Sequence, residues 1–200
     1  MTAPSTNWVI SVSKLISNFF NPIVSLLIFY GYHSAKNLTV KGALNYITPI
    51  LLIIIIPVVV WIVMNVKKGN YTNMDVSNRK QRKSLYYFLI AALAIYLGYY
   101  YFRFSELDYM MFYLLFLLIL MHFSNFFIKS SMHTGLNIFV AALFYSENHT
   151  LGIAWFILSL IIGITRIILK RHTPAEVFSG AFLAILVSIP YLYSTNQLFY

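Results

Sequence analysis

Cysteine is absent from this sequence, and charged residues are few. Without cysteine there is no disulfide, no thiolate metal ligand and no cysteine nucleophile, although this absence fits either side of a membrane. Charged residues make up only 10% of the 200 positions, hydrophobic residues make up 60%, and the mean hydropathy is +0.76. This composition excludes a soluble domain and indicates an integral membrane protein.

The N-terminal segment also lacks the features of a cleaved signal peptide. MTAPSTNW has no basic residue, and no cleavage site of small residues follows the first apolar run. We therefore expect this run to be retained as a membrane helix.

Apolar segments of membrane-spanning length follow one another along the chain. They lie at 9–32, 43–66, 85–103, 109–128, 134–146, 150–169 and 174–194. We expect an all-α fold, a polytopic integral membrane helical bundle with about six to seven transmembrane helices, forming a single domain over residues 1–200. The segment 134–146 is short and predicts a tilted or half-buried helix packed among its neighbours. Four prolines predict kinks: Pro22, Pro49, Pro57 and Pro190.

The polar connections predict one basic face. Segment 67–84 carries six cations and one acid, whereas the loop at 105–108 is short and acidic. If every segment crosses, the connections at 67–84, 129–133 and 165–173 are separated by two crossings each time. All three then reach the same face and can contribute to one site.

Three residue patterns occur in order on that face. Their residues are Arg82, then Ser131 and His133, then Arg166, His172 and Glu176. Together they resemble the type 2 phosphatidic acid phosphatases, the membrane branch of a superfamily shared with the vanadium haloperoxidases. That family's signature is Lys-x6-Arg-Pro, Pro-Ser-Gly-His and Ser-Arg-x5-His-x3-Asp. The resemblance covers about residues 75–180, with motif blocks at about 75–84, 129–135 and 165–180.

The sequence departs from the signature at six positions. Asp75 replaces Lys, Lys83 and Ser130 replace Pro, Met132 replaces Gly, Thr165 replaces Ser, and Glu176 replaces Asp. Arg79 and Arg82 are three residues apart and would share one face of a helix. Arg79 or Lys80 is therefore a candidate for the role of the missing Lys.

The residue types suit a phosphate ester. Arginine binds phosphate oxygens bidentately and stays charged, so Arg82 and Arg166 are candidates for a clamp. Helix N-termini at 131–135 and 173–176 would add backbone N–H donors. The resemblance implies these phosphate-binding residues: Arg79, Lys80, Arg82, Ser131, Met132 and Arg166.

The resemblance also implies a two-step hydrolysis. His172 is the expected nucleophile, and Glu176 is expected to orient it and stabilise its developing charge. His133 is expected to protonate the leaving alkoxide and then to activate water. We expect no metal and no other cofactor, because the arginines neutralise the phosphate charge. The expected substrate is a lipid-linked phosphate of the phosphatidic acid, phosphatidylglycerol phosphate or polyprenyl diphosphate class. Membrane lipids are the expected partners, without nucleic acid, and the oligomeric state stays open.

Each block also has a structural explanation. Lys and Arg at helix ends commonly set membrane topology. Ser130 and Ser131 fit a helix cap, with His133 in an ordinary buried hydrogen bond, and Thr173 and Glu176 fit a capping box. Two other functions therefore stay open: a catalytically inactive member that binds anionic lipid headgroups, and an unrelated transporter or scaffold.

Two indications disagree on which side of the membrane the site faces. We expect a protein of the bacterial inner (cytoplasmic) membrane, and the family commonly places its site on the outer side. Apart from Arg79, Arg82 and Arg166, the motif face carries Lys67, Lys68, Lys80, Lys83, Lys129, Lys170 and Arg171, against Lys36, Lys41 and Arg103 opposite. By the positive-inside rule, this distribution favours a cytoplasmic site.

Overall fold

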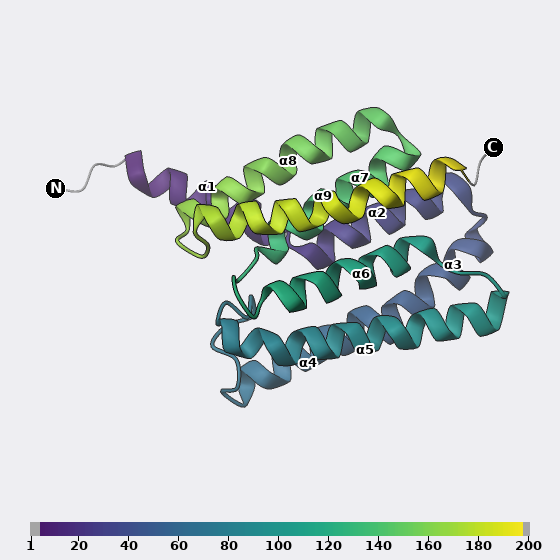
Figure 1. Ribbon diagram of the computed structural model, residues 1–200, viewed down its shortest axis with the longest axis horizontal. Coiled ribbons are helices and arrows are strands. Elements are labelled where there is room, and N and C mark those ends of the chain that lie inside the picture. Colours follow the sequence, from purple (N-terminus) through teal and green to yellow (C-terminus); the bar gives the residue numbers. More distant parts are fainter. Residues whose placement is uncertain (1–4, 198–200) are drawn as a thin grey trace. The chain divides into compact units, whose positions relative to one another are not determined.

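The computed structural model describes residues 5–197, which form helices and no strand. The elements are α1 (Ser5–Phe19), α2 (Pro22–Asn37), α3 (Val40–Pro49), the π-helical segment η1 (Ile50–Ile55), α4 (Ile56–Lys67), α5 (Arg79–Phe104), α6 (Tyr109–Ser124), α7 (Met132–Glu147), α8 (His149–Ile168) and α9 (Pro174–Gln197) (Figure 1). The predicted all-α fold is therefore confirmed over this range.

The chain forms two compact units. Of the described residues, the first unit contains 5–29 and 130–197, and the second unit is Tyr30–Lys129. In the first unit, α7 packs against both α8 and α9, and α1 packs against α8 (Figure 1). In the second unit, α5 packs against α4, η1 and α6. The described helices fall into these two units, and the single domain expected from the sequence stays a prediction.

Within residues 5–197, four stretches are long and apolar enough to cross a membrane, and they indicate an integral membrane protein. They are Val40–Lys67, which joins α3, η1 and α4, and then Arg79–Phe104, His149–Ile168 and Pro174–Thr195. Helices α1 and α2 meet at a bend of 53°, and they add a fifth span if the bent pair is counted as one. The predicted six to seven spans are not confirmed, because α6 and α7 have only 16 residues each. A perpendicular span needs about 20.

Helix α7 is buried over most of its length. Every residue from 133 to 144 is buried, as expected for a helix inside a core rather than one facing lipid. The prediction of a short helix packed among its neighbours is thus confirmed. Its contact with α8 is close at Gly152, where an added Cβ would lie 2.5 Å from Tyr145 Cα.

Three of the four prolines singled out from the sequence lie at irregular points, whereas Pro190 lies inside α9, which continues past it. Pro22 begins α2 directly after the 53° bend. Pro49 ends α3 and Pro57 lies at the start of α4, so the two prolines flank the π-helical segment. The i→i+5 hydrogen bonds of the π-helical segment accommodate these two prolines, which have no backbone N–H to donate.

Candidate functional site

The third motif block folds as a helix-ending turn. Lys170 has a φ of 54°, and its N–H donates to the Ile167 carbonyl at 2.9 Å. Arg171 N–H donates to the Arg166 carbonyl at 3.0 Å. These two bonds define a Schellman motif at the end of α8. His172 N–H also donates to the Arg166 carbonyl, at 3.3 Å, so the Arg-x5-His spacing ties the two backbones together through this turn.

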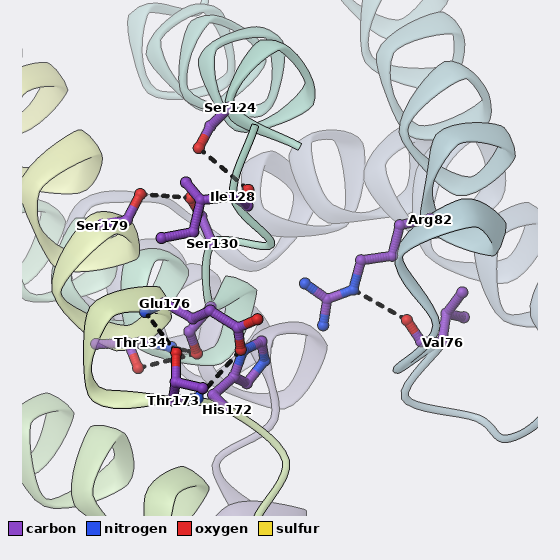
Figure 2. Close-up of polar contacts among 11 residues, drawn as sticks. Val76, Arg82, Ser124, Ile128, Ser130, Thr134, His172, Thr173, Glu176 and Ser179 are labelled. Atoms are coloured by element: carbon purple, nitrogen blue, oxygen red, sulfur yellow. Dashed lines mark hydrogen bonds and ion pairs between the residues drawn. The ribbon is translucent and has the colours of Figure 1, made fainter. Parts of the chain in front are cut away.

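His172 and Glu176 form a close pair at the start of α9. His172 Nδ1 lies 2.8 Å from Glu176 Oε2 (Figure 2). The histidine side chain is 0% exposed and the glutamate side chain is 18% exposed. A carboxylate accepts only from a protonated nitrogen, so in the neutral ring this contact puts the proton on Nδ1 and the lone pair on Nε2. Nε2 is then the ring nitrogen that can act as an acceptor.

The same carboxylate oxygen completes a capping box. Thr173 N–H donates to Glu176 Oε2 at 3.1 Å, and Glu176 N–H donates to Thr173 Oγ1 at 3.3 Å (Figure 2). The predicted capping box is therefore confirmed. It does not compete with the histidine contact, because one oxygen serves both. The box fixes the carboxylate in the orientation that faces His172.

Ser131 caps α7, as the structural explanation of the second block predicts. Its Oγ accepts from Thr134 N–H at 3.4 Å and from Thr134 Oγ1 at 3.0 Å. Ser130 instead shares a hydrogen bond with Ser179 of α9, at 2.7 Å (Figure 2). His133, in the first turn of α7, is buried, and Met132 is half-buried. The second block therefore lies at a helix N-terminus, where backbone N–H groups favour anions.

The N-terminal ends of α7 and α9 lie in direct contact. Ser131 N–H donates to the Glu176 carbonyl at 2.9 Å. The approach depends on Gly180, where an added Cβ would lie 2.5 Å from the Ser131 carbonyl oxygen. We did not single out Gly180 from the sequence, although a glycine inside a helix, which costs about 1 kcal/mol relative to alanine, is a signal of such packing. The second and third blocks therefore meet within the first unit.

Arg166 is fully buried in the first unit. Its Nη1 donates to Ser17 Oγ of α1 at 2.8 Å, and Ser17 is itself fully buried. A guanidinium removed from water needs hydrogen bonds or a counter-charge. The hydroxyl of Ser17 supplies one such bond, and nothing in the sequence near Arg166 indicated that α1 would supply it.

The first motif block lies in the second unit. Arg82 is 1% exposed, and its Nε donates to the Val76 carbonyl at 2.9 Å (Figure 2). Val76 is fully buried with a φ of 45°, a conformation that is unfavourable for a β-branched residue. The contact with Arg82 ties this strained residue to the first turn of α5.

Arg79 and Lys80, the two candidates for the missing Lys, have different surroundings. Arg79 Nε donates to the Asn125 carbonyl at 2.7 Å, its Nη2 donates to the Phe126 carbonyl, and Asn125 Nδ2 donates to the Arg79 carbonyl at 3.2 Å. Arg79 therefore caps the C-terminal end of α6. Lys80 is exposed, and its N–H donates to Oδ1 of the N-cap residue Asn78 at 2.9 Å. Lys80 keeps its ammonium group at the surface.

The side chains described in the structure include no group of three or more His, Cys, Asp or Glu placed to hold a metal ion. No protein-family model, curated protein or solved structure matches this chain. The resemblance to the phosphatases therefore rests on the motif residues and on the geometry given above.

Proposed function

We propose that this protein is a metal-independent membrane phosphatase that hydrolyses a lipid-linked phosphate through a phosphohistidine intermediate. The substrate class is that of phosphatidic acid, phosphatidylglycerol phosphate or polyprenyl diphosphate. The observation that carries the proposal is the contact between His172 Nδ1 and Glu176 Oε2, held by a capping box at the start of α9. The order of the motif blocks supports an assignment to the type 2 phosphatidic acid phosphatases.

In the first step, the Nε2 lone pair of His172 attacks phosphorus and the bond to the leaving oxygen breaks. Glu176 accepts the hydrogen bond from Nδ1–H and stabilises the positive charge that the ring acquires. His133 gives a proton to the leaving alkoxide, whose hydrocarbon tails stay in the membrane.

In the second step, water attacks the phosphohistidine. His133, now neutral, takes a proton from that water as the P–N bond breaks. Phosphate leaves, and His172 regains its neutral form with the proton on Nδ1. The balance is one water consumed and one phosphate released, together with one alcohol from a phosphate monoester or one polyprenyl phosphate from a polyprenyl diphosphate.

Phosphate binding is assigned to arginines and to helix N-terminal donors. In the first unit these are Arg166, the Ser131 hydroxyl and the Met132 N–H. The resemblance implies a phosphate-binding role for Arg82 as well. Lys80 is the stronger candidate for the missing Lys, because Arg79 already caps α6. The distribution of Lys and Arg favours a site on the cytoplasmic side of a bacterial inner membrane.

The test is phosphate release by the purified protein from a panel of lipid phosphates in excess chelator. We expect turnover that persists in chelator, is inhibited by vanadate and is absent in His172→Ala. Vanadate inhibits because its trigonal-bipyramidal adduct with a histidine resembles the transition state. Turnover that stops in chelator and returns with Mg²⁺ or Zn²⁺ would contradict the mechanism.

The capping contacts of Arg79 favour a second candidate function. With Asp75 at the family's Lys position and Arg79 bonded to the end of α6, the first block lacks one of its usual cations. A member that binds anionic headgroups without turnover would fit this loss. Binding of phosphatidic acid together with no release of phosphate across the whole panel would favour this function over hydrolysis.

A further inference from the structure

A cavity of about 300 Å³ lies between α7, α8 and α9 in the first unit. Its floor is buried, since Ile138 and Ala141 of α7 are each 3% exposed. Its rim is exposed, since Ile153 of α8 is 54% exposed and Ile189 of α9 is 62% exposed. The cavity therefore opens at the surface between α8 and α9, which are both long and apolar enough to cross a membrane. In a membrane, this opening faces the hydrocarbon of the bilayer.

The cavity extends through about one leaflet. Along α7 its lining runs from Tyr145 inward to Ile138, and the polar connection 147–149 lies just beyond Tyr145. The stretch of helix from Ile138 to this connection covers about 14 Å, and half of a hydrocarbon core is about 15 Å thick. The lining residues of α9 lie at 185–192, towards its C-terminal end, whereas Glu176 lies in its first turn. The cavity thus belongs to the leaflet opposite the second and third motif blocks.

A polar side chain in the cavity wall has no hydrogen-bond partner. Ser188 of α9 is 6% exposed, and its buried hydroxyl makes no hydrogen bond within the described part of the chain. A helical serine can donate to a carbonyl of its own helix, as Ser159 of α8 and Ser194 of α9 do. The hydroxyl of Ser188 makes no such bond, so it is available to a molecule in the cavity.

Ser188 lies near the polar end of the cavity. It precedes Tyr191 by about one helical turn, and the Tyr191 hydroxyl lies 3.0 Å from Ser146 Oγ. Ser146 comes directly before the connection 147–149. The ester groups of a glycerolipid lie at the boundary between the hydrocarbon core and the headgroup region, so an ester carbonyl can approach Ser188 at this end.

Neither water nor another helix suits this cavity. A buried water needs about two to four polar partners, whereas the lining residues other than Tyr145 and Ser188 are apolar. A helix with its side chains is about 10–12 Å across, and a volume of about 300 Å³ is at the lower end for ligand pockets. A single acyl chain matches the depth and the apolar lining, and its ester carbonyl supplies the acceptor that Ser188 lacks.

We propose that this cavity binds one acyl chain of a glycerolipid from the leaflet opposite the motif blocks. The chain lies against α7 between α8 and α9, and the Ser188 hydroxyl donates to the ester carbonyl oxygen. The headgroup stays outside the cavity, so the site does not select it. The inference stands apart from the proposed reaction, because no lining residue belongs to a motif block.

The test measures lipid binding by native mass spectrometry of the purified full-length protein in detergent. One probe is phosphatidylcholine, which has no phosphomonoester for the proposed reaction. The other probe is its diether analogue with the same chains, which lacks both ester carbonyls. We expect one tightly bound phosphatidylcholine per protein. The diether lipid should bind about two- to tenfold more weakly, which is the effect of one neutral hydrogen bond.

Ser188→Ala tests the hydrogen bond. This variant should bind phosphatidylcholine about two- to tenfold more weakly than the wild type does, and it should no longer distinguish the two lipids. Without lipid, its unfolding temperature should equal or exceed that of the wild type, since the deleted hydroxyl has no partner among the described residues.

Ala142→Leu tests the cavity itself. Ala142 lines the cavity and is 7% exposed, so a leucine there fills part of the space and should abolish the tight binding of either lipid. Ala154→Leu is the matched control, because Ala154 is an exposed residue of α8 outside the cavity lining. It should bind both lipids as the wild type does.

Equal binding of the two lipids by the wild type would overturn the inference, and so would a folded Ala142→Leu protein with unchanged lipid binding. If Ala142→Leu does not fold, the comparison of the two lipids on the wild type and Ser188→Ala still decides. A wild-type protein without a tightly bound lipid would also overturn the inference. If that protein is a dimer, the surface between α8 and α9 belongs to a second copy of the chain instead.

Discussion

Glu176 Oε2 lies 2.8 Å from His172 Nδ1 and also accepts the Thr173 N–H that precedes its own helix. One carboxylate oxygen therefore closes the N-terminus of α9 and orients the imidazole. The two roles differ in what they require. A cap needs an acceptor, whereas the imidazolium of the proposed phosphoryl transfer would also need a negative charge.

Glu176→Gln separates these roles. The amide oxygen still accepts from Thr173 N–H, so the unfolding temperature should stay close to that of the wild type. The neutral side chain no longer stabilises the charged ring, so turnover should fall at least about a hundredfold, equivalent to ~2.7 kcal/mol of transition-state stabilisation. Phosphate release and thermal unfolding of the same preparation check both expectations.

Two further variants control this experiment. Thr173→Ala removes the cap's hydroxyl and should cost about 1 kcal/mol of stability while the His172–Glu176 contact keeps turnover measurable. Glu176→Asp restores the family's residue and should keep measurable activity. A Glu176→Gln protein that hydrolyses lipid phosphate at the wild-type rate would rule out the orienting role.

Gly180→Ala should weaken the contact between the starts of α7 and α9. The added Cβ would lie 2.5 Å from the Ser131 carbonyl oxygen, so the backbones must separate. We expect a loss of about 1–3 kcal/mol in the free energy of unfolding, seen as a lower unfolding temperature. Turnover should fall as well, because Ser131 and Glu176 are displaced.

Gly98→Ala is the matched control for Gly180→Ala. Gly98 also lies inside a long helix, but nothing lies within 4 Å of the Cβ that would be added there. Alanine is the better helix former, so this variant should be neutral or more stable by up to about 1 kcal/mol. Equal effects of the two substitutions would show that the Ser131 contact is unimportant.

Asp108 predicts a pH dependence of stability. It is 6% exposed at the start of α6, where Met111 N–H donates to Oδ1 at 3.1 Å and the Tyr96 hydroxyl donates to Oδ2 at 3.0 Å. Burial raises the pKa of Asp108 above its ordinary value of 3.8, and these hydrogen bonds offset only part of the effect. The folded state therefore holds this proton more tightly than the unfolded state does.

The sign of the effect follows from linkage. Because the pKa of Asp108 is higher in the folded state, its bound proton contributes to stability, and this contribution is complete below pH 3.8. The contribution is lost as the pH rises through the folded-state pKa of Asp108. Other groups titrate too, so the informative quantity is the wild-type unfolding temperature minus that of Asp108→Asn. This difference should fall with rising pH across that window. A flat difference, or one that rises, would contradict the buried-carboxyl explanation.

Sidedness is testable because the chain has no cysteine of its own. Met74, in the basic connection before α5, is 52% exposed, so Met74→Cys offers a single accessible thiol. A cytoplasmic site predicts no labelling of intact cells by an impermeant thiol reagent and full labelling after permeabilisation. Labelling of intact cells would place the basic connection outside.

Local sequence was sufficient for features that depend on neighbouring residues. Apolar composition and run length indicated a helical membrane protein, because crossing hydrocarbon requires long apolar helices. The capping box at Thr173 and Glu176 was predicted because its partners lie three residues apart on one turn. The number of spans could not be predicted in the same way. Run length alone does not show that α1 and α2 meet at a bend, or that α7 packs between α8 and α9.

Tertiary structure decided the contacts between distant residues. Arg166 bonds to Ser17, 149 positions away, and Arg79 bonds to the carbonyl of Asn125, 46 positions away. Ser131 reaches the Glu176 carbonyl only because Gly180 leaves room for its backbone. Such contacts depend on how helices pack, since apolar side chains drive burial without direction and a side chain's partner is fixed only once the helices are in place.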